Sequence, residues 1–309
     1  MKPAPLRIAT RKSALALWQA EHVAARLRAL VPERPVELLP ISTQGDRNLQ
    51  DSLAAIGGKG LFIKELEVAL GEHRADLAVH SMKDVPAELP EGFTIAAVLE
   101  REDPRDAFVS IRHASFAGLP EGARIGSSSL RRQCQLLYRR RDLKVLPLRG
   151  NVDTRLRKLA AGEYDAIVLA VAGLKRLGLS QHITAILDAE TSLPAITQGV
   201  IGIECRRDDA ATVGLVRGLN HVPTWQRVLA ERALNRALSG SCVVPVAGYA
   251  ELDGGRLHLR GRVGMPDGSR MIEGEISGDA VQAETLGRTL ADDMLARGAG
   301  EVLRHVAGR

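Results

Sequence analysis

The sequence predicts an α/β protein of three domains, in which two α/β lobes are joined by a hinge and a small C-terminal α+β domain carries an antiparallel sheet. Three observations support this prediction: the length of 309 residues, the alternation of strand-like and helix-like segments over the first two-thirds of the chain, and a change to hairpin-like patterns after about Asn220. Two stretches, at Asp103-Pro104 and at Pro194–Gly199, are typical of crossings between lobes. The predicted chain leaves the first lobe, builds the second and returns, which is the plan of periplasmic-binding-protein-like folds.

The first lobe is expected to comprise residues 1–100 together with 198–218. Its first helix has apolar residues near helical spacing, among them Leu15, Val23 and Leu27. The predicted elements are the strands Leu6–Ala9, Val36–Ile41, Asp76–His80 and Val200–Cys205, and the helices Ser13–Leu30 and Leu61–Leu70. Alternation of this kind favours a parallel sheet.

The second lobe is expected to comprise residues 101–197, and the C-terminal domain residues 219–309. The predicted elements of the second lobe are the strands Ala107–Ser110, Arg124–Gly126, Lys144–Leu148 and Ala166–Ala170, and the helices Ser129–Arg140 and Val152–Ala161. In the last domain, helices over Thr224–Leu238 and Ala280–Arg297 flank three alternating strands, Val243–Leu252, Arg256–Val263 and Arg270–Ile276. Hairpin signals separate these strands at Asp253-Gly254-Gly255 and Pro266-Asp267-Gly268.

Arginine dominates the basic residues. The chain has 42 basic and 37 acidic residues, for a formal net charge of +5, and 34 of the basic residues are Arg against 8 Lys. The planar guanidinium pairs bidentately with carboxylate or phosphate, so an anionic ligand is one explanation. A GC-rich genome that encodes Arg in place of Lys is the other, and the total does not separate them.

Composition disfavours several classes of protein. The three cysteines, Cys134, Cys205 and Cys242, form no disulfide framework and no zinc-binding motif. The N-terminus lacks the pattern of a signal segment, and the apolar run Ala166–Leu174 is too short to span a bilayer. We therefore expect a cytoplasmic protein with no metal and no membrane partner. Aromatic residues make up only 3%, so few side chains could stack on bases, and nucleic acid is not an expected partner.

Cations follow the predicted strands of both lobes, at the ends where open α/β sheets bind ligands. Several of these positions also carry hydroxyl groups at a helix N-terminus, which favours anions. The residues concerned are Arg11, Lys12 and Ser13; Ser81, Lys83 and Asp84; Ser127, Ser128, Ser129, Arg131 and Arg132; Arg149 and Arg155; and Lys175 and Arg176. Because five strand ends each deliver a cation, we expect an arginine-lined cleft between the lobes for several anionic groups at once.

The sequence lacks the common phosphate-binding motifs, which disfavours a phosphate ligand. Neither a GxxxxGK[ST] loop nor a GxGxxG turn after a strand is present. The glycine-rich stretch Gly57–Gly60, which contains Lys59, precedes a helix without a strand before it, and it fits a flexible lid better than a phosphate cradle. A polycarboxylate is therefore the favoured ligand.

Two residues point to chemistry rather than binding alone. Asp84 is an acid among cations, where it could steady a cationic intermediate or pass protons in a reaction that loses ammonia; a turn cap before Val85-Pro86 is the alternative. Cys242 lies in a loop of small residues, accessible to a ligand, although an inert buried thiol remains the alternative from these residues alone.

Assembled in chain order, these segments resemble the porphobilinogen deaminase family, also called hydroxymethylbilane synthase. The likeness runs from about residue 6 to 250 and is highly specific. The matching stretches are residues 11–16 (RKSALA), 57–62 (GGKGLF), 78–86 (AVHSMKDVP), 101–107 (REDPRDA), 127–132 (SSSLRR), 148–156 (LRGNVDTRL), 202–206 (GIECR) and the loop of Cys242.

The resemblance implies a transferase that joins four porphobilinogen units head to tail with loss of ammonia, giving hydroxymethylbilane in tetrapyrrole biosynthesis. It also implies a dipyrromethane cofactor held as a thioether on Cys242, a catalytic carboxylate at Asp84, and a monomer. The positions that match cofactor-binding ones are Lys83, Ser13, Ser129, Arg131, Arg132 and Arg155. Those that match or plausibly line the substrate site are Arg11, Arg149, Arg155, Arg176, Gln19 and Gln198, and Lys59 falls in the mobile loop of the family.

Two small departures from the family are present. Thr197 stands where the family usually has Gly, which could stiffen the crossing segment, and Ser241 stands where Gly often precedes the cysteine. A non-catalytic two-lobed polycarboxylate-binding protein is the alternative function. It accounts for the lobes and the arginines, but not for Asp84, Cys242 or the third domain.

Overall fold

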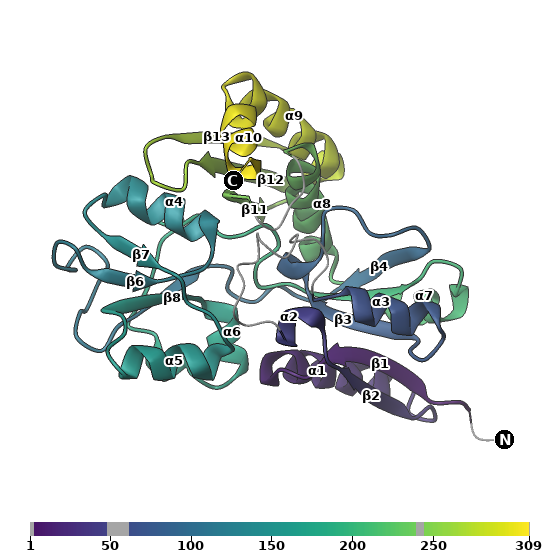
Figure 1. The fold of residues 1–309 in the computed structure, drawn as a ribbon. Helices are drawn as coiled ribbons and strands as arrows, with labels where there is room; N and C mark the ends of the chain where they lie inside the picture. The colour runs from purple at the N-terminus through teal and green to yellow at the C-terminus, as the bar shows by residue number, and fades with distance from the viewer. Residues whose placement is uncertain (1–2, 48–61, 239–243, 309) are drawn as a thin grey trace. The chain divides into compact units, whose positions relative to one another are not determined.

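The computed structural model describes residues 3–47, 62–238 and 244–308. The chain forms two compact units, each built from two stretches of sequence (Figure 1). The first unit contains Met1–Glu102 and Val200–Trp225, and the second contains Asp103–Gly199 and Gln226–Arg309. The predicted three-domain boundaries stay a prediction, and each unit is described here by itself.

A five-stranded mixed sheet forms the centre of the first unit, in the order β2-β1-β3-β10-β4. Its strands are β1 (Leu6–Arg11), β2 (Val36–Ile41), β3 (Leu77–Ser81), β4 (Phe93–Val98) and β10 (Ile201–Arg206). β1 is parallel to β2 and β3, as predicted, but β10 is antiparallel to β3 and β4, so the all-parallel sheet expected from the sequence is wrong. Ile201 pairs with Ser81, and β10 therefore begins at the edge where β3 ends.

Helices cover both faces of this sheet. One face carries α1 (Ala14–Leu30) and α7 (Ala210–Arg217), whose buried residues join those of the sheet in one core. The other face carries α3 (Lys64–Gly71), which buries Leu66 and Leu70, each worth about 1.5–3 kcal/mol when fully removed from water. A short helix, α2 (Gln44–Arg47), precedes the segment that lies outside the described residues.

The second unit contains a similar five-stranded sheet, in the order β7-β6-β8-β5-β9. Its strands are β5 (Asp106–Val109), β6 (Arg124–Gly126), β7 (Lys144–Leu146), β8 (Ala166–Ala170) and β9 (Ala185–Ile186). β6 is parallel to β7 and β8, whereas β5 is antiparallel to β8 and pairs its first residue, Asp106, with Ala170. The start of β5 thus lies at the edge where β6, β7 and β8 end.

Helices cover both faces of this second sheet as well (Figure 1). They are α4 (Leu130–Arg139) on one face, and α5 (Val152–Ala160) and α6 (Val171–Arg176) on the other. Leu136 of α4 packs with Phe108 of the sheet, and Leu159 of α5 packs with Ile167. Each lobe is therefore a helix–sheet–helix sandwich, as the alternating pattern predicted.

The three-stranded antiparallel sheet near the C-terminus confirms the predicted hairpins. Its strands are β11 (Val246–Asp253), β12 (Arg256–Gly264) and β13 (Met271–Asp279), and the helices α8 (Val222–Ala237), α9 (Ala283–Ala296) and α10 (Ala299–Ala307) share its core. The predicted closing helix, Ala280–Arg297, corresponds to α9, and the sequence did not predict α10, which follows after Gly298 with φ +97°.

This sheet packs against the lobe of the same unit through a buried arginine. Arg262 of β12 donates to the Gln135 side chain of α4 and to the carbonyls of Ala189 and Glu190, at 2.9–3.0 Å. It also pairs with Glu273 of β13 at 2.9 Å. The guanidinium thus joins α4, the loop after β9 and the C-terminal sheet.

Candidate functional site

The first unit places a cation and a catalytic candidate at one edge of its sheet, because the parallel strands β1 and β3 end there. Arg11, the last residue of β1, lies over the Phe62 ring at 4.2 Å from its centroid. Ser13 caps α1 by accepting a hydrogen bond from the Ala16 N–H at 3.4 Å. The Ser13 hydroxyl therefore marks the N-terminus of a helix beside the strand ends, as predicted.

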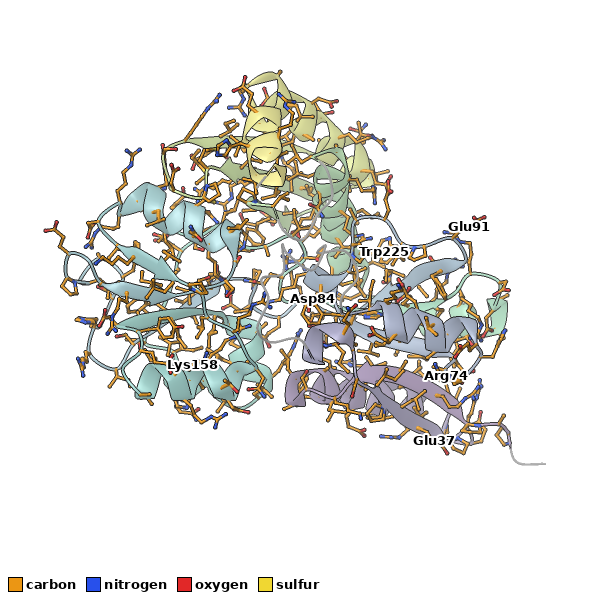
Figure 2. All side chains as sticks on the ribbon, viewed as in Figure 1. Glu37, Arg74, Asp84, Glu91, Lys158 and Trp225 are labelled. Carbon is orange, nitrogen blue, oxygen red and sulfur yellow. The ribbon has the colours of Figure 1, made fainter. Side chains whose placement is uncertain are left out.

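Asp84 ends a one-turn 3₁₀ helix, Met82–Asp84, that directly follows β3 (Figure 2). The turn is held at both ends, because the Met82 N–H donates to the Val200 carbonyl at 2.9 Å and the Val85 N–H to the Met82 carbonyl at 3.1 Å. Met82 is buried, whereas the side chains of Lys83 and Asp84 are partly exposed. Within residues 3–47, 62–238 and 244–308, no group forms a hydrogen bond or ion pair with the Asp84 carboxylate, which leaves it available to a ligand.

Gln19 is buried and bonded to the end of β3. Its side-chain N–H donates to the Ser81 hydroxyl at 2.9 Å, and that hydroxyl can donate back to the Gln19 carbonyl oxygen at 3.1 Å. The structure therefore places Gln19 behind Ser81, three residues before Asp84, where it supports the strand end.

The second unit gathers hydroxyl groups and arginines at the corresponding edge. Ser129 caps α4 by accepting from the Arg132 N–H at 3.4 Å, and Ser128 is bonded in both directions to the Leu148 backbone at 2.9 Å. These contacts join the ends of β6 and β7. They set the first turn of α4, and with it Arg131 and Arg132, against the sheet edge.

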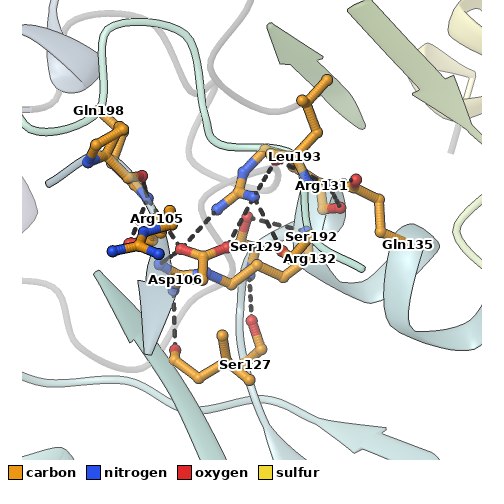
Figure 3. Close-up of polar contacts among 12 residues, drawn as sticks. Arg105, Asp106, Ser127, Ser129, Arg131, Arg132, Gln135, Ser192, Leu193 and Gln198 are labelled. Carbon is orange, nitrogen blue, oxygen red and sulfur yellow. Dashed lines mark hydrogen bonds and ion pairs between the residues drawn. The ribbon is translucent and has the colours of Figure 1, made fainter. Parts of the chain in front are cut away.

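Arg131 and Arg132 converge on one buried carboxylate, that of Asp106 (Figure 3). Arg131 Nη1 lies 2.9 Å from Asp106 Oδ2, and Arg132 Nη2 lies 2.7 Å from Oδ1. The same carboxylate accepts from the Ser192 hydroxyl at 2.8 Å and from Gln198 Nε2 at 2.9 Å. Asp106 therefore fixes the orientation of both guanidiniums.

This cluster has more positive than negative charge. Burial acts to raise the pKa of Asp106, but the charges of Arg131 and Arg132 and their hydrogen bonds outweigh it and hold that pKa well below its usual range. One carboxylate thus faces two guanidiniums, and among the described residues no second acid pairs with either. The Nε atoms of both arginines are buried without a hydrogen-bond partner in that same part of the chain.

An anionic group fits this arrangement, because buried charge is costly unless it is compensated. The N-terminus of α4 adds further positive potential at the same place. The residues present therefore suit a carboxylate-bearing cofactor such as dipyrromethane.

Arg149, Arg155 and Arg176 are partly exposed at the same edge of the second unit. Arg155 Nε donates to the Gly150 carbonyl at 2.8 Å, and Arg176 Nη2 donates to the Gly199 carbonyl at 2.6 Å. Arg149 directly precedes the turn that leads to α5, whose cap is Asn151. Three of the predicted ligand-binding arginines thus belong to the same unit as the Asp106 cluster.

The backbone of the crossing segment is left-handed at position 197, a conformation that favours glycine. Thr197 adopts φ +57°, the left-handed region that disfavours β-branched residues, and its N–H donates to Glu231 Oε2 at 2.6 Å. Its neighbour Gln198 is buried, and it donates to the Pro104 carbonyl at 2.6 Å as well as to Asp106. The structure places Gln198 in the support of the arginine cluster.

Cys242 and Lys59 lie outside the described residues. The other two cysteines are buried, and desolvation raises the pKa of each thiol to about 12. Cys134 and Cys205 are therefore protonated and unreactive at neutral pH.

Sequence reasoning missed Asp106, Ser192 and Gln135 as members of the site. Ser192 donates to Asp106, the carboxylate that pairs with Arg131. Gln135 donates to the Leu193 carbonyl, which also accepts a hydrogen bond from Arg131. Asp106 was missed because only residues after strands were considered, whereas an antiparallel strand brings its first residue to the same edge. Its place in the matching stretch 101–107 was the available signal.

The fold and these two cationic edges define a two-lobed α/β protein that handles carboxylate ligands. The chain belongs to the porphobilinogen deaminase family. The family model described as "Porphobilinogen deaminase, dipyromethane cofactor binding domain" matches residues 6–214, and that of the "Porphobilinogen deaminase, C-terminal domain" matches residues 225–296. It is accordingly a transferase that condenses four porphobilinogen molecules, with release of ammonia, to hydroxymethylbilane in tetrapyrrole biosynthesis.

Solved structures with a similar fold include proteins that bind small molecules. The periplasmic aliphatic sulphonate binding protein of Escherichia coli is 16% identical, with a TM-score of 0.42 over 76% of this chain and 70% of that one. A periplasmic substrate-binding protein of an ABC transporter from Coxiella burnetii is 14% identical, with a TM-score of 0.45 over 73% and 94% of the two chains. At these scores the similarities carry no argument about function.

Two further features of the described residues concern metal-ligating groups and membrane-spanning helices. The part of the chain that the structure describes contains no group of three or more metal-ligating side chains. It also contains no helix that is both long and apolar enough to cross a membrane.

Proposed function

We propose that Asp84 is the catalytic carboxylate and that Cys242 anchors the dipyrromethane cofactor through a thioether. The observation that carries the first assignment is the Asp84 carboxylate itself, partly exposed and without a partner among the described residues, on a turn whose backbone is bonded at both ends. The second assignment rests on the family match and on the two other thiols being buried.

The arginine cluster of the second unit is proposed to hold carboxylates of the cofactor. The excess positive charge of Arg131 and Arg132 supports this role, and Ser129 adds a helix N-terminus beside them. Lys83 and Ser13 of the first unit, together with Arg155, are proposed to bind the same group. When bound, dipyrromethane supplies the pyrrole end to which substrate units are added.

Arg11, Arg149, Arg155 and Arg176 are proposed to bind the acetate and propionate groups of porphobilinogen. Guanidinium groups suit this task, because they bind carboxylates in a fixed planar geometry. Gln19 and Gln198 are proposed to support the site, since the side chain of each is bonded to a residue of it. Lys59 is proposed to belong to the loop that covers the substrate.

Each addition forms a carbon–carbon bond at the aminomethyl carbon of one porphobilinogen and breaks its bond to nitrogen, so that ammonia leaves. The attacked pyrrole carbon loses a proton. Asp84 is proposed to accept hydrogen bonds from pyrrole N–H groups and to stabilise the positive charge that develops as ammonia departs, which is electrostatic stabilisation by a preoriented group. The arginines meanwhile compensate the two carboxylates that each substrate unit adds.

We further propose that the protein works as a monomer in the cytoplasm and binds no nucleic acid. The two described cysteines are free thiols, which supports a reducing compartment.

Asp84→Asn tests the central assignment. The variant should fold and carry the cofactor but lose most turnover, because the amide cannot stabilise positive charge. Intact-mass spectrometry reports the cofactor on Cys242, and an assay of hydroxymethylbilane formation reports turnover. An active protein with the unmodified mass would refute the thioether, and near-normal turnover of Asp84→Asn would refute the role of this carboxylate.

A further inference from the structure

A buried cluster of ionisable groups lies directly behind the catalytic turn. His80, the fourth residue of β3, contacts Glu204 of β10 with 2.7 Å between His80 Nε2 and Glu204 Oε2. Both side chains are almost fully buried. Glu67 of α3, also buried, lies close enough to interact electrostatically with both. One residue from each of three packed elements therefore meets between the sheet and α3.

The two carboxyl groups of the cluster are incompletely satisfied. Glu67 Oε1 and Glu204 Oε1 are buried, and neither has a hydrogen-bond partner among the described residues. A buried ionised carboxylate without partners is costly, so burial favours the protonated form of Glu67. Burial raises the pKa of Glu67 to about 7, the Glu204 charge adds to this effect and His80 opposes it.

Other charged groups around this layer have their own partners. Arg206 of β10 donates to the carbonyls of Leu70 and Ala75, both at 2.8 Å. On β1, Arg7 pairs with Asp76, and Arg11 lies over Phe62. On α3, Glu65 accepts a hydrogen bond from the Gln44 N–H. The charge within the cluster therefore depends mainly on His80, Glu204 and Glu67 themselves.

The cluster is connected to Asp84 by a short stretch of backbone. His80 and Gly202 are paired across β3 and β10, and Ser81, the next residue of β3, pairs with Ile201. The 3₁₀ turn begins at the following residue and is bonded to Val200, the residue before β10. A contact that joins β3 to β10 at this point fixes both strands on which the turn rests.

We propose that His80 and Glu204 are positioning residues for Asp84, and that the buried carboxyl of Glu67 acts on their contact through its charge. This inference rests on the assignment of Asp84 as the catalytic carboxylate. When Glu67 holds its proton, it carries no charge beside the pair of His80 and Glu204. When Glu67 is ionised, its negative charge acts on both members of the pair, and through their contact on the order of the catalytic turn.

Glu204→Gln tests the pair in the cofactor-loaded enzyme. We expect kcat to fall about 10-fold to 100-fold, as for a small misplacement of a catalytic group, with KM and cofactor mass unchanged. Asp76→Asn is the matched control, because Asp76 is also a carboxylate of the first sheet but pairs with Arg7 next to the opposite end of β3. It should lower stability and leave kcat intact. Parental kcat in Glu204→Gln, or equal kcat loss in both variants, overturns the proposal.

Glu67→Gln provides a second test that does not depend on Glu204→Gln folding. In the parent protein, kcat should change with pH through a midpoint near the Glu67 pKa of about 7. In Glu67→Gln that change should disappear, while His80 and Glu204 remain. Superimposable pH profiles of the two proteins overturn the role of Glu67. Near-normal turnover of Asp84→Asn would instead refute the proposed function, so the two failures are distinguishable.

Discussion

Glu67→Gln should remove a pH dependence from the stability of the folded protein. Glu67 is buried in α3, and its pKa is raised from 4.5 to about 7 by burial and by the charge of Glu204, against the opposing charge of His80. In the unfolded chain the carboxyl returns to its ordinary pKa. Between pH 4.5 and about 7 the folded state therefore binds a proton that the unfolded state has released.

The sign and size of the effect follow from this difference in proton binding. The stabilisation from the protonated carboxyl is fully present below pH 4.5, declines as the pH rises, and is lost above about pH 7. One pKa unit corresponds to 1.36 kcal/mol, so the whole decline amounts to roughly 3 kcal/mol for this group. A glutamine at this position cannot ionise, so the folded state of the variant should avoid the free-energy cost of a buried carboxylate at every pH.

Urea denaturation between pH 5 and pH 8 measures the effect. The two proteins should be nearly equal in stability at pH 5, and Glu67→Gln should be more stable by roughly 3 kcal/mol at pH 8. Glu37→Gln, which removes an exposed carboxylate from β2 of the same unit, should follow the parent profile. A constant difference between Glu67→Gln and the parent across this range would show that Glu67 ionises normally in the fold.

Three other outcomes are expected. Asp106→Asn leaves Arg131 and Arg132 without their carboxylate, so it should cost about 3–5 kcal/mol in denaturation experiments and lower the cofactor content seen by mass spectrometry; an unchanged midpoint would contradict this. Thr197→Gly relieves the left-handed backbone and should raise the unfolding free energy by about 0.5–1 kcal/mol, whereas a loss would show that the side chain matters more than φ. Arg149→Leu should stall elongation and leave enzyme-bound intermediates of discrete length in mass spectra, and unchanged product formation would count against its role.

The sequence predicted the lobes well because their helices begin at recognisable caps and their strands are nearly continuous apolar runs. Ser13 and Ser129 cap the helices that were expected to begin at these residues. Strand direction was not predictable, since a buried antiparallel strand such as β10 reads like a parallel one.

The unknown strand direction also limited the prediction of the site residues. The cations after parallel strands were found from the sequence, but Asp106, at the start of antiparallel β5, was not. The burial of Arg131 and Arg132 was likewise hidden, because each looks like any surface arginine until the partner carboxylate is known. Pairings between residues distant in sequence, such as that of Glu67 with Glu204, depend on packing that local patterns do not encode.

The two buried thiols have a consequence for how the protein acquires its cofactor. A covalent attachment assembled from a reactive pyrrole substrate could modify any nucleophilic cysteine that the substrate reaches. Cys134 and Cys205 do not react in this way, because both thiols are buried and their pKa values are raised to about 12. Of the three cysteines in the chain, two are thus chemically silent, and the proposed attachment at Cys242 meets no competition from them.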